Sequence, residues 1–229
     1  MRLANFLRLI SALLLLPLAC SFGETLVDSV RQAKDVSRLD VVALLSFTAG
    51  IVGFLALWHF RPPVKAYVLG HELTHAAVAL LFGAKVSKLK VAASGGCVTV
   101  SKSNMMITLS PYFFPFYTIL LAACTSVAGV FVSPLPWKPL WFFLAGFTWF
   151  FHICFTLDSL VRRQPDIMEF GRIFSYVMIW LFNVGCVILS LVALTELKFS
   201  FVFRSLAGNA VEAYVTVYEF IRSLPFLQA

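Results

Sequence analysis

Five stretches of the chain are apolar over roughly the length that an α-helix needs to cross a lipid bilayer. They are residues 41–60, 64–83, 105–133, 139–159 and 173–195. Hydrophobic residues make up 60% of the sequence and charged residues 13%, whereas soluble domains are about 45–50% apolar and about 25% charged. Because lipid offers the backbone no hydrogen-bonding partners, such segments must be helical. The sequence therefore predicts an all-α polytopic membrane protein with five transmembrane helices, or six if the C-terminal tail also crosses.

Less apolar segments flank this series of helices. Residues 1–40 begin with a hydrophobic stretch that resembles either a cleaved signal peptide or an uncleaved first membrane helix kinked at Pro17, and they end in a mixed-charge connector. Residues 196–229 mix aromatic and aliphatic side chains with Glu and Arg, which is typical of an amphipathic helix at the membrane surface. We therefore expect an N-terminal segment, a membrane core over residues 41–195 and a C-terminal amphipathic helix.

Residues 85–102, KVSKLKVAASGGCVTVSK, differ in character from the runs on either side. Val, Lys and Ser alternate around a Ser-Gly-Gly sequence, and this alternation predicts a β-hairpin. The edges of a hairpin cannot lie exposed in hydrocarbon, because their backbone groups would lack partners. We expect this small hairpin to lie at the membrane interface or in a cavity lined by protein.

The second apolar run carries three ionisable residues in the sequence HELTH, and they point to a metal site. His71 and His75 are four residues apart, so one helical turn places both rings on one face. Two imidazoles at this spacing bind zinc, and the carboxylate of Glu72 beside them suits the activation of a water molecule. We therefore predict His71 and His75 as Zn²⁺ ligands and Glu72 as the general base and acid of a peptide-bond hydrolysis.

An alternative explanation is a buried polar network that holds no metal, as in an inactive protease or a proton-conducting transporter. Each ionisable group at the centre of a bilayer costs at least about 2.5–3.5 kcal/mol, so three within five residues need strong compensation. A bound cation provides that compensation. A transporter would also be expected to show paired broken helices in an inverted repeat, and the sequence shows no internal repeat.

Three features together resemble the site-2-protease-like intramembrane metalloproteases, most closely a small bacterial subgroup: HELTHAAVALLFGAKV, the Gly-Gly hairpin, and SKSNMMITLSPYFFPFY. The resemblance covers roughly residues 40–195. It implies a zinc enzyme, multi-pass in a bacterial inner membrane, that cuts within or beside membrane-spanning substrates. It also implies that the hairpin forms part of a membrane-associated sheet, whose exposed edge could receive an unwound substrate as an added strand.

The sequence departs from that family at the third metal ligand, which is generally an Asp followed by Gly on a later helix. The nearest strings are LDS at 157–159 and QPDI at 164–167. If the spans at 64–83 and 139–159 run parallel, His152 lies level with His75, whereas Asp158 lies about a turn and a half deeper. Depth therefore favours His152 as the third ligand. Asp166 is the alternative by analogy with the family, although QPD also suits a helix N-cap.

These observations predict an intramembrane zinc metalloendopeptidase whose partners are the lipid bilayer and membrane-protein substrates. Two rival functions remain: a catalytically inactive relative that binds membrane proteins without cutting them, and a transporter that uses the ionisable residues as a proton relay. Nucleic-acid binding is not expected, because the net charge of +7 is not gathered into a basic patch interleaved with aromatic residues.

Overall fold

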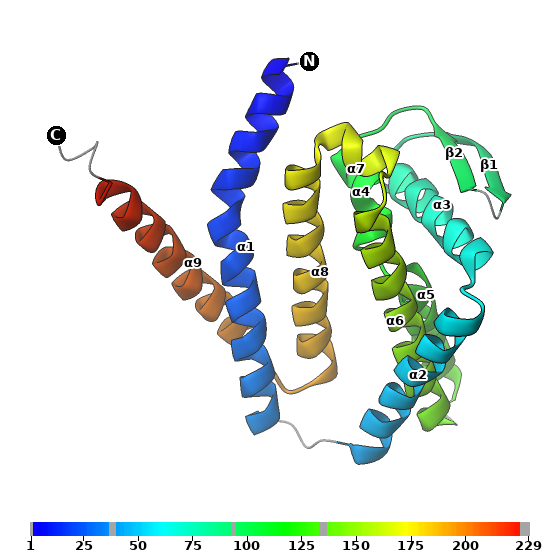
Figure 1. Cartoon of the computed structure of the whole chain (residues 1–229). Helices are drawn as coiled ribbons and strands as arrows, with labels where there is room; N and C mark the ends of the chain where they lie inside the picture. Colours follow the sequence, from blue (N-terminus) through cyan, green and yellow to red (C-terminus); the bar gives the residue numbers. More distant parts are fainter. Residues whose placement is uncertain (1, 37–39, 93–94, 133–136, 225–229) are drawn as a thin grey trace. The chain divides into compact units, whose positions relative to one another are not determined.

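The structure is a computed structural model that describes residues 2–36, 40–92, 95–132 and 137–224. Within them the chain is helical apart from one small antiparallel sheet, as the sequence predicted (Figure 1). Its internal contacts define two units, one of Met1–Leu39 with Ile167–Ala229 and one of Asp40–Asp166. The second unit contains the HELTH helix. The sequence-based division instead carried the membrane core on to residue 195.

Four of the described helices are long and apolar enough to cross a membrane: α1 (Arg2–Val36), α2 (Val41–Phe60), α6 (Lys138–Val161) and α8 (Arg172–Leu194). A fifth crossing is possible if the bent segment formed by α4 (Met105–Leu109), η1 (Ser110–Tyr112) and α5 (Phe116–Phe131) counts as one. The helix α3 (Val64–Leu81), which contains HELTH, is not among the four. Its ionisable side chains lower its hydropathy, and protein shields them instead of lipid.

In the Asp40–Asp166 unit, α2 and α6 pack against each other along their length (Figure 1). Two glycines make this possible. A Cβ on Gly50 would lie 2.0 Å from the carbonyl oxygen of Phe143, and one on Gly146 would lie 2.1 Å from that of Phe47. Small residues at helix interfaces allow such close approach in membranes. Asp40 caps α2 and forms an ion pair with Lys138 at 2.7 Å, so the two helices start together and run parallel.

The HELTH helix α3 is covered by the hairpin and by the bent segment. Strands β1 (Val86–Ala92) and β2 (Gly95–Val100) pair antiparallel, with a bulge near Lys88, and this confirms the predicted hairpin. The bent segment turns by 83° between η1 and α5, where the sequence has Pro111 and Pro115. It begins at Asn104, whose side chain accepts a hydrogen bond from the Ile107 amide at 2.9 Å. Together these elements surround the polar face of α3.

In the other unit, α1 contacts α8 and α9 (Phe199–Arg222). The amphipathic helix α9 directs polar side chains towards α1: Ser205 donates to Asp28 at 2.8 Å, and Asn209 donates to Thr25 at 3.1 Å. Large apolar side chains elsewhere on α9, including Phe199, Phe203 and Tyr218, are exposed. Ser205 and Asn209 are therefore satisfied by protein, and the exposed apolar side chains of α9 are available to lipid.

We expect Gly146→Ala to lower the thermal unfolding midpoint in detergent, by the equivalent of about 1–3 kcal/mol, because the new methyl group meets backbone of α2. Gly208→Ala in α9 is the matched control, since no atom lies within 4 Å of its added Cβ. Equal midpoints for the two variants would contradict the close contact between α2 and α6.

Candidate metal centre

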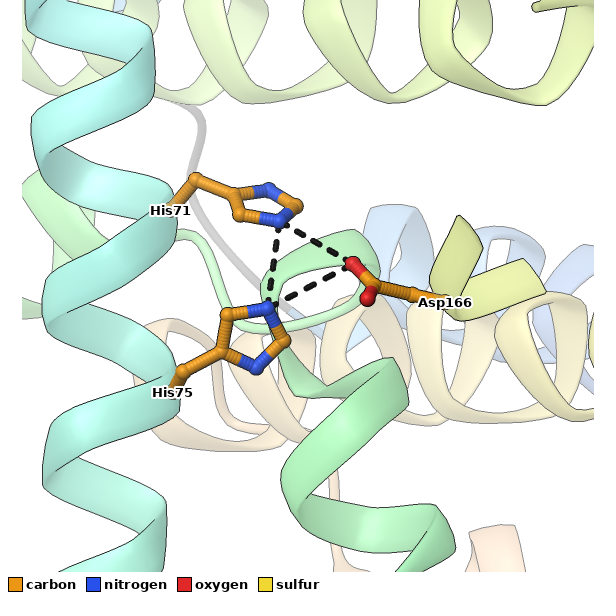
Figure 2. A group of neighbouring side chains, drawn as sticks. All are labelled: His71, His75 and Asp166. Carbon is orange, nitrogen blue, oxygen red and sulfur yellow. Dashed lines mark hydrogen bonds and ion pairs between the residues drawn. The ribbon is translucent and has the colours of Figure 1, made fainter. Parts of the chain in front are cut away.

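The helix α3 places His71 and His75 one above the other, with their Nε2 atoms 3.2 Å apart. Figure 2 shows both rings projecting from the same side of the helix. Alanine and leucine around the motif favour a regular helix. The Thr74 hydroxyl donates a hydrogen bond to the Gly70 carbonyl at 2.7 Å, within the same helix. His75 is buried and His71 is half-buried. The two rings therefore converge inside the unit and do not face lipid.

A carboxylate approaches the two rings from a separate element, the short helix α7 (Pro165–Phe170). The Oδ2 atom of Asp166 lies 3.3 Å from Nε2 of His71 and 3.5 Å from Nε2 of His75 (Figure 2). Among the described residues, these three side chains form a group whose ligand atoms all lie within 4.8 Å of one another. The structure thus brings together both predicted histidines and the aspartate that the sequence analysis held as the alternative.

The hydrogen bonds around the group indicate that a hydrogen or a metal ion must lie at its centre. The Ile107 carbonyl oxygen can only accept, so Nδ1 of His75, 2.7 Å away, carries a proton. In a neutral ring Nε2 is then a bare acceptor, and it faces Nε2 of His71 and the Asp166 carboxylate. Such acceptors repel one another unless a proton or a metal ion lies between them. Two imidazole nitrogens and a carboxylate oxygen are a donor set of catalytic zinc sites, so these residues fit Zn²⁺.

The Asp166 carboxyl is held in its charged form. Burial by itself would raise its pKa, but the hydrogen bonds and charge interactions with His71 and His75 together outweigh burial. The pKa consequently lies well below that of an ordinary aspartate. An anionic ligand at neutral pH suits the binding of a divalent cation.

Two other candidate ligands from the sequence lie elsewhere. His152 is buried and lines a small cavity beside His71, but it is not a member of the converging group. Asp158 forms an ion pair with Arg162 at 2.8 Å. The depth estimate compared positions along two straight helices, whereas α6 ends at Val161 and α7 brings Asp166 to the histidines. The geometry favours Asp166 over His152, whose role as a ligand stays a prediction.

Glu72 is buried beside the group and touches the hairpin. Its carboxyl is close enough to His71 and His75 to interact with their charge, and the backbone amide of Val98 lies beside it. A Cβ added to Gly96 would lie 2.6 Å from the Cγ atom of Glu72 and 2.7 Å from its Oε1 atom. Only glycine at this position of β2 allows the strand to lie directly against the proposed base.

Sequence reasoning did not find three partners of the group: Tyr67, Tyr112 and the Ile107 carbonyl. Tyr67 could have been found, because it precedes His71 by four residues and so shares its helix face. Tyr112 and Ile107 carry no such signal, because they lie in the short α4–η1 stretch, whose packing against α3 depends on the tertiary fold.

A family model described as Peptidase M50B-like matches residues 41–162, more than half of the chain. The chain belongs to the M50B-like peptidase family. This confirms the resemblance to site-2 proteases, a family of zinc-dependent metallopeptidases. The matched region holds His71, Glu72 and His75 of this M50B-like chain and ends four residues before Asp166. Searches of curated proteins and of solved structures find no match.

We expect Asp166→Ala to abolish stoichiometric zinc binding by the purified protein, and His152→Ala to leave zinc bound, because Asp166 and not His152 belongs to the converging group found among the described residues. Zinc is measured by elemental analysis after dialysis, with a thermal unfolding scan of each variant as the check of folding. Zinc loss in His152→Ala with zinc retained in Asp166→Ala would reverse the assignment.

Proposed function

We propose that this protein is an intramembrane zinc metalloendopeptidase that hydrolyses peptide bonds of membrane-spanning or membrane-associated substrates. The observation that carries the proposal is the convergence of His71, His75 and Asp166 next to Glu72 in a chain of the M50B-like family. The apolar helices support a multi-pass protein, and the resemblance to a bacterial subgroup favours a bacterial inner membrane.

His71, His75 and Asp166 are the residues that would hold the zinc ion. Bound zinc supplies Lewis-acid chemistry: it lowers the pKa of a water molecule and polarises the carbonyl of the scissile bond. The Glu72 carboxylate takes a proton from the attacking water and passes it to the nitrogen of the departing amine. Water is thereby added across one C–N bond, and the products are a carboxylic acid and an amine.

We place the substrate-binding site of this proposal along the hairpin. In a two-stranded sheet each strand has one edge without a partner strand, and an extended peptide can pair there through main-chain hydrogen bonds. Strand β2 lies against Glu72 at Gly96, so a peptide bound along the hairpin would pass near the base. A helical substrate has to unwind locally before it can bind in this way.

The sequence lacks the Asp-Gly motif that generally supplies the third ligand in this family, so a catalytically inactive relative remained a rival function. The position of Asp166 weakens that rival, because a carboxylate reaches the histidines without the motif. The transporter rival gains no support from the described residues, in which the three ligand-type side chains that converge, His71, His75 and Asp166, are arranged as a metal centre.

We expect Glu72→Gln to retain zinc and to lose cleavage of a membrane substrate reconstituted with it in liposomes, by at least about a hundredfold. The amide keeps the size of the side chain but cannot accept the proton. Cleavage is followed by gel mobility and mass spectrometry of the products. Unchanged cleavage would remove Glu72 from the mechanism, and zinc-loaded wild-type protein that cuts no membrane substrate would favour the inactive relative.

We expect Gly96→Ala to reduce cleavage by at least about tenfold while zinc stays bound, because the methyl group displaces the Glu72 carboxyl and not the metal ligands. Cys97→Ala is the matched control, since Cys97 is the next residue of β2 and its side chain is exposed. Equal rates for the two variants would show that contact between β2 and Glu72 is unimportant for catalysis.

A further inference from the structure

Each of the three proposed zinc ligands has a hydrogen-bonding partner in the surrounding protein. The phenol oxygen of Tyr67 lies 3.3 Å from Nδ1 of His71. The Ile107 carbonyl oxygen lies 2.7 Å from Nδ1 of His75. The hydroxyl of Tyr112 donates to Oδ2 of Asp166 at 3.0 Å. Two of these three partners are tyrosine hydroxyls. A phenylalanine ring would fill the same space, so the presence of the hydroxyl groups needs an explanation.

The Tyr67 hydroxyl fixes where the proton of His71 lies. If Nε2 of His71 binds a metal ion, its Nδ1 must carry the hydrogen and donate it to the Tyr67 oxygen. The hydroxyl hydrogen of Tyr67 is then directed to Oγ of Ser159, 2.7 Å away and fully buried. The Tyr67 ring is itself held by stacking on Phe155, with ring centroids 4.4 Å apart and planes 2° from parallel.

The Tyr112 hydroxyl fixes the Asp166 carboxylate. Tyr112 is fully buried, and its ring packs edge-on against His71 with centroids 5.3 Å apart. Because a carboxylate can only accept, the phenol donates to the same oxygen that faces both histidines. That oxygen is carried by the short helix α7, so without Tyr112 its position would depend on the rotamer of a single side chain.

The bent segment supplies both the Ile107 carbonyl and the Tyr112 hydroxyl, on either side of Leu109. The residue four positions after Ile107 is Pro111, which has no N–H to donate to the Ile107 carbonyl. That carbonyl instead accepts from Oγ of Ser110 at 2.9 Å and lies 2.7 Å from Nδ1 of His75. This short stretch, which precedes the 83° bend, therefore presents a carbonyl and a phenol to two different ligands.

We propose that Tyr67 and Tyr112 are positioning residues that preorganise the zinc site, Tyr67 by fixing the tautomer of His71 and Tyr112 by orienting Asp166. This inference rests on the metal site of the proposed function and names the residues that tune it. Outer partners of metal ligands typically change metal affinity by about 10–100-fold when they are removed.

The test compares Tyr67→Phe and Tyr112→Phe with Tyr117→Phe in the full-length protein in detergent. Tyr117 is the matched control, because it packs against the same aromatic cluster as Tyr67. Its hydroxyl donates to the Ala66 carbonyl at 2.6 Å, not to a proposed ligand. All three substitutions remove one oxygen and keep the ring. Thermal unfolding of the metal-free variants checks that each one folds.

Zinc affinity is measured by competition with a chromogenic chelator, and Co²⁺ in place of zinc gives an absorption spectrum that reports ligand geometry. We expect Tyr67→Phe and Tyr112→Phe to bind zinc about 10–100-fold more weakly, with an altered Co²⁺ spectrum. Tyr117→Phe should stay within about twofold of the wild type with the same spectrum. Wild-type affinity and spectrum in both folded test variants, or equal losses in all three, would overturn the inference.

The readout separates this inference from the proposed function. If the wild-type protein binds zinc with the expected tyrosine dependence but cuts no membrane substrate, the positioning roles stand and the protease assignment fails. If the wild-type protein binds no zinc, both fail.

Discussion

The structure of the Asp40–Asp166 unit depends on one electrostatic constraint: three acceptor atoms meet where lipid cannot solvate them. Nε2 of His71, Nε2 of His75 and Oδ2 of Asp166 lie 3.2–3.5 Å from one another. In a medium of low dielectric constant such a cluster is stable only if a cation or a proton neutralises it. The hairpin and the bent segment pack on the helix α3 that carries both histidines, which explains why a chain so rich in apolar helices keeps irregular backbone at this place.

Much of the fold could be predicted from the sequence, because hydrophobicity and length determine membrane helices directly. The expected spans at 41–60, 139–159 and 173–195 agree with α2, α6 and α8 to within about two residues. The alternation around Gly95 and Gly96 predicted the hairpin. The His71–His75 pair followed from helical periodicity, since both residues lie on the same helix and their proximity does not depend on the tertiary fold.

The third donor could not be predicted in this way. Ranking His152 ahead of Asp166 assumed that the spans at 64–83 and 139–159 are straight and run parallel. What it cannot include is the turn at residues 162–164, after which α7 carries Asp166 to the histidines. Tyr112 was missed for a related reason, because it lies in η1, a single short turn whose packing against α3 depends on the tertiary fold. Turns of a few residues decide which polar groups meet, and hydrophobic periodicity carries no information about them.

The two carboxylates of the site illustrate how surroundings divide their roles. Asp166 is engaged by both histidines and by Tyr112, so its charge is committed to the cluster and its geometry is fixed. Glu72 is instead bordered by the backbone of β2, where Gly96 leaves its carboxyl just enough room. A carboxylate in contact with the strand that would pair with a substrate can exchange a proton with that substrate, whereas one enclosed by metal ligands cannot. Under the proposed function, the contact between Gly96 and Glu72 would couple peptide binding to the chemistry.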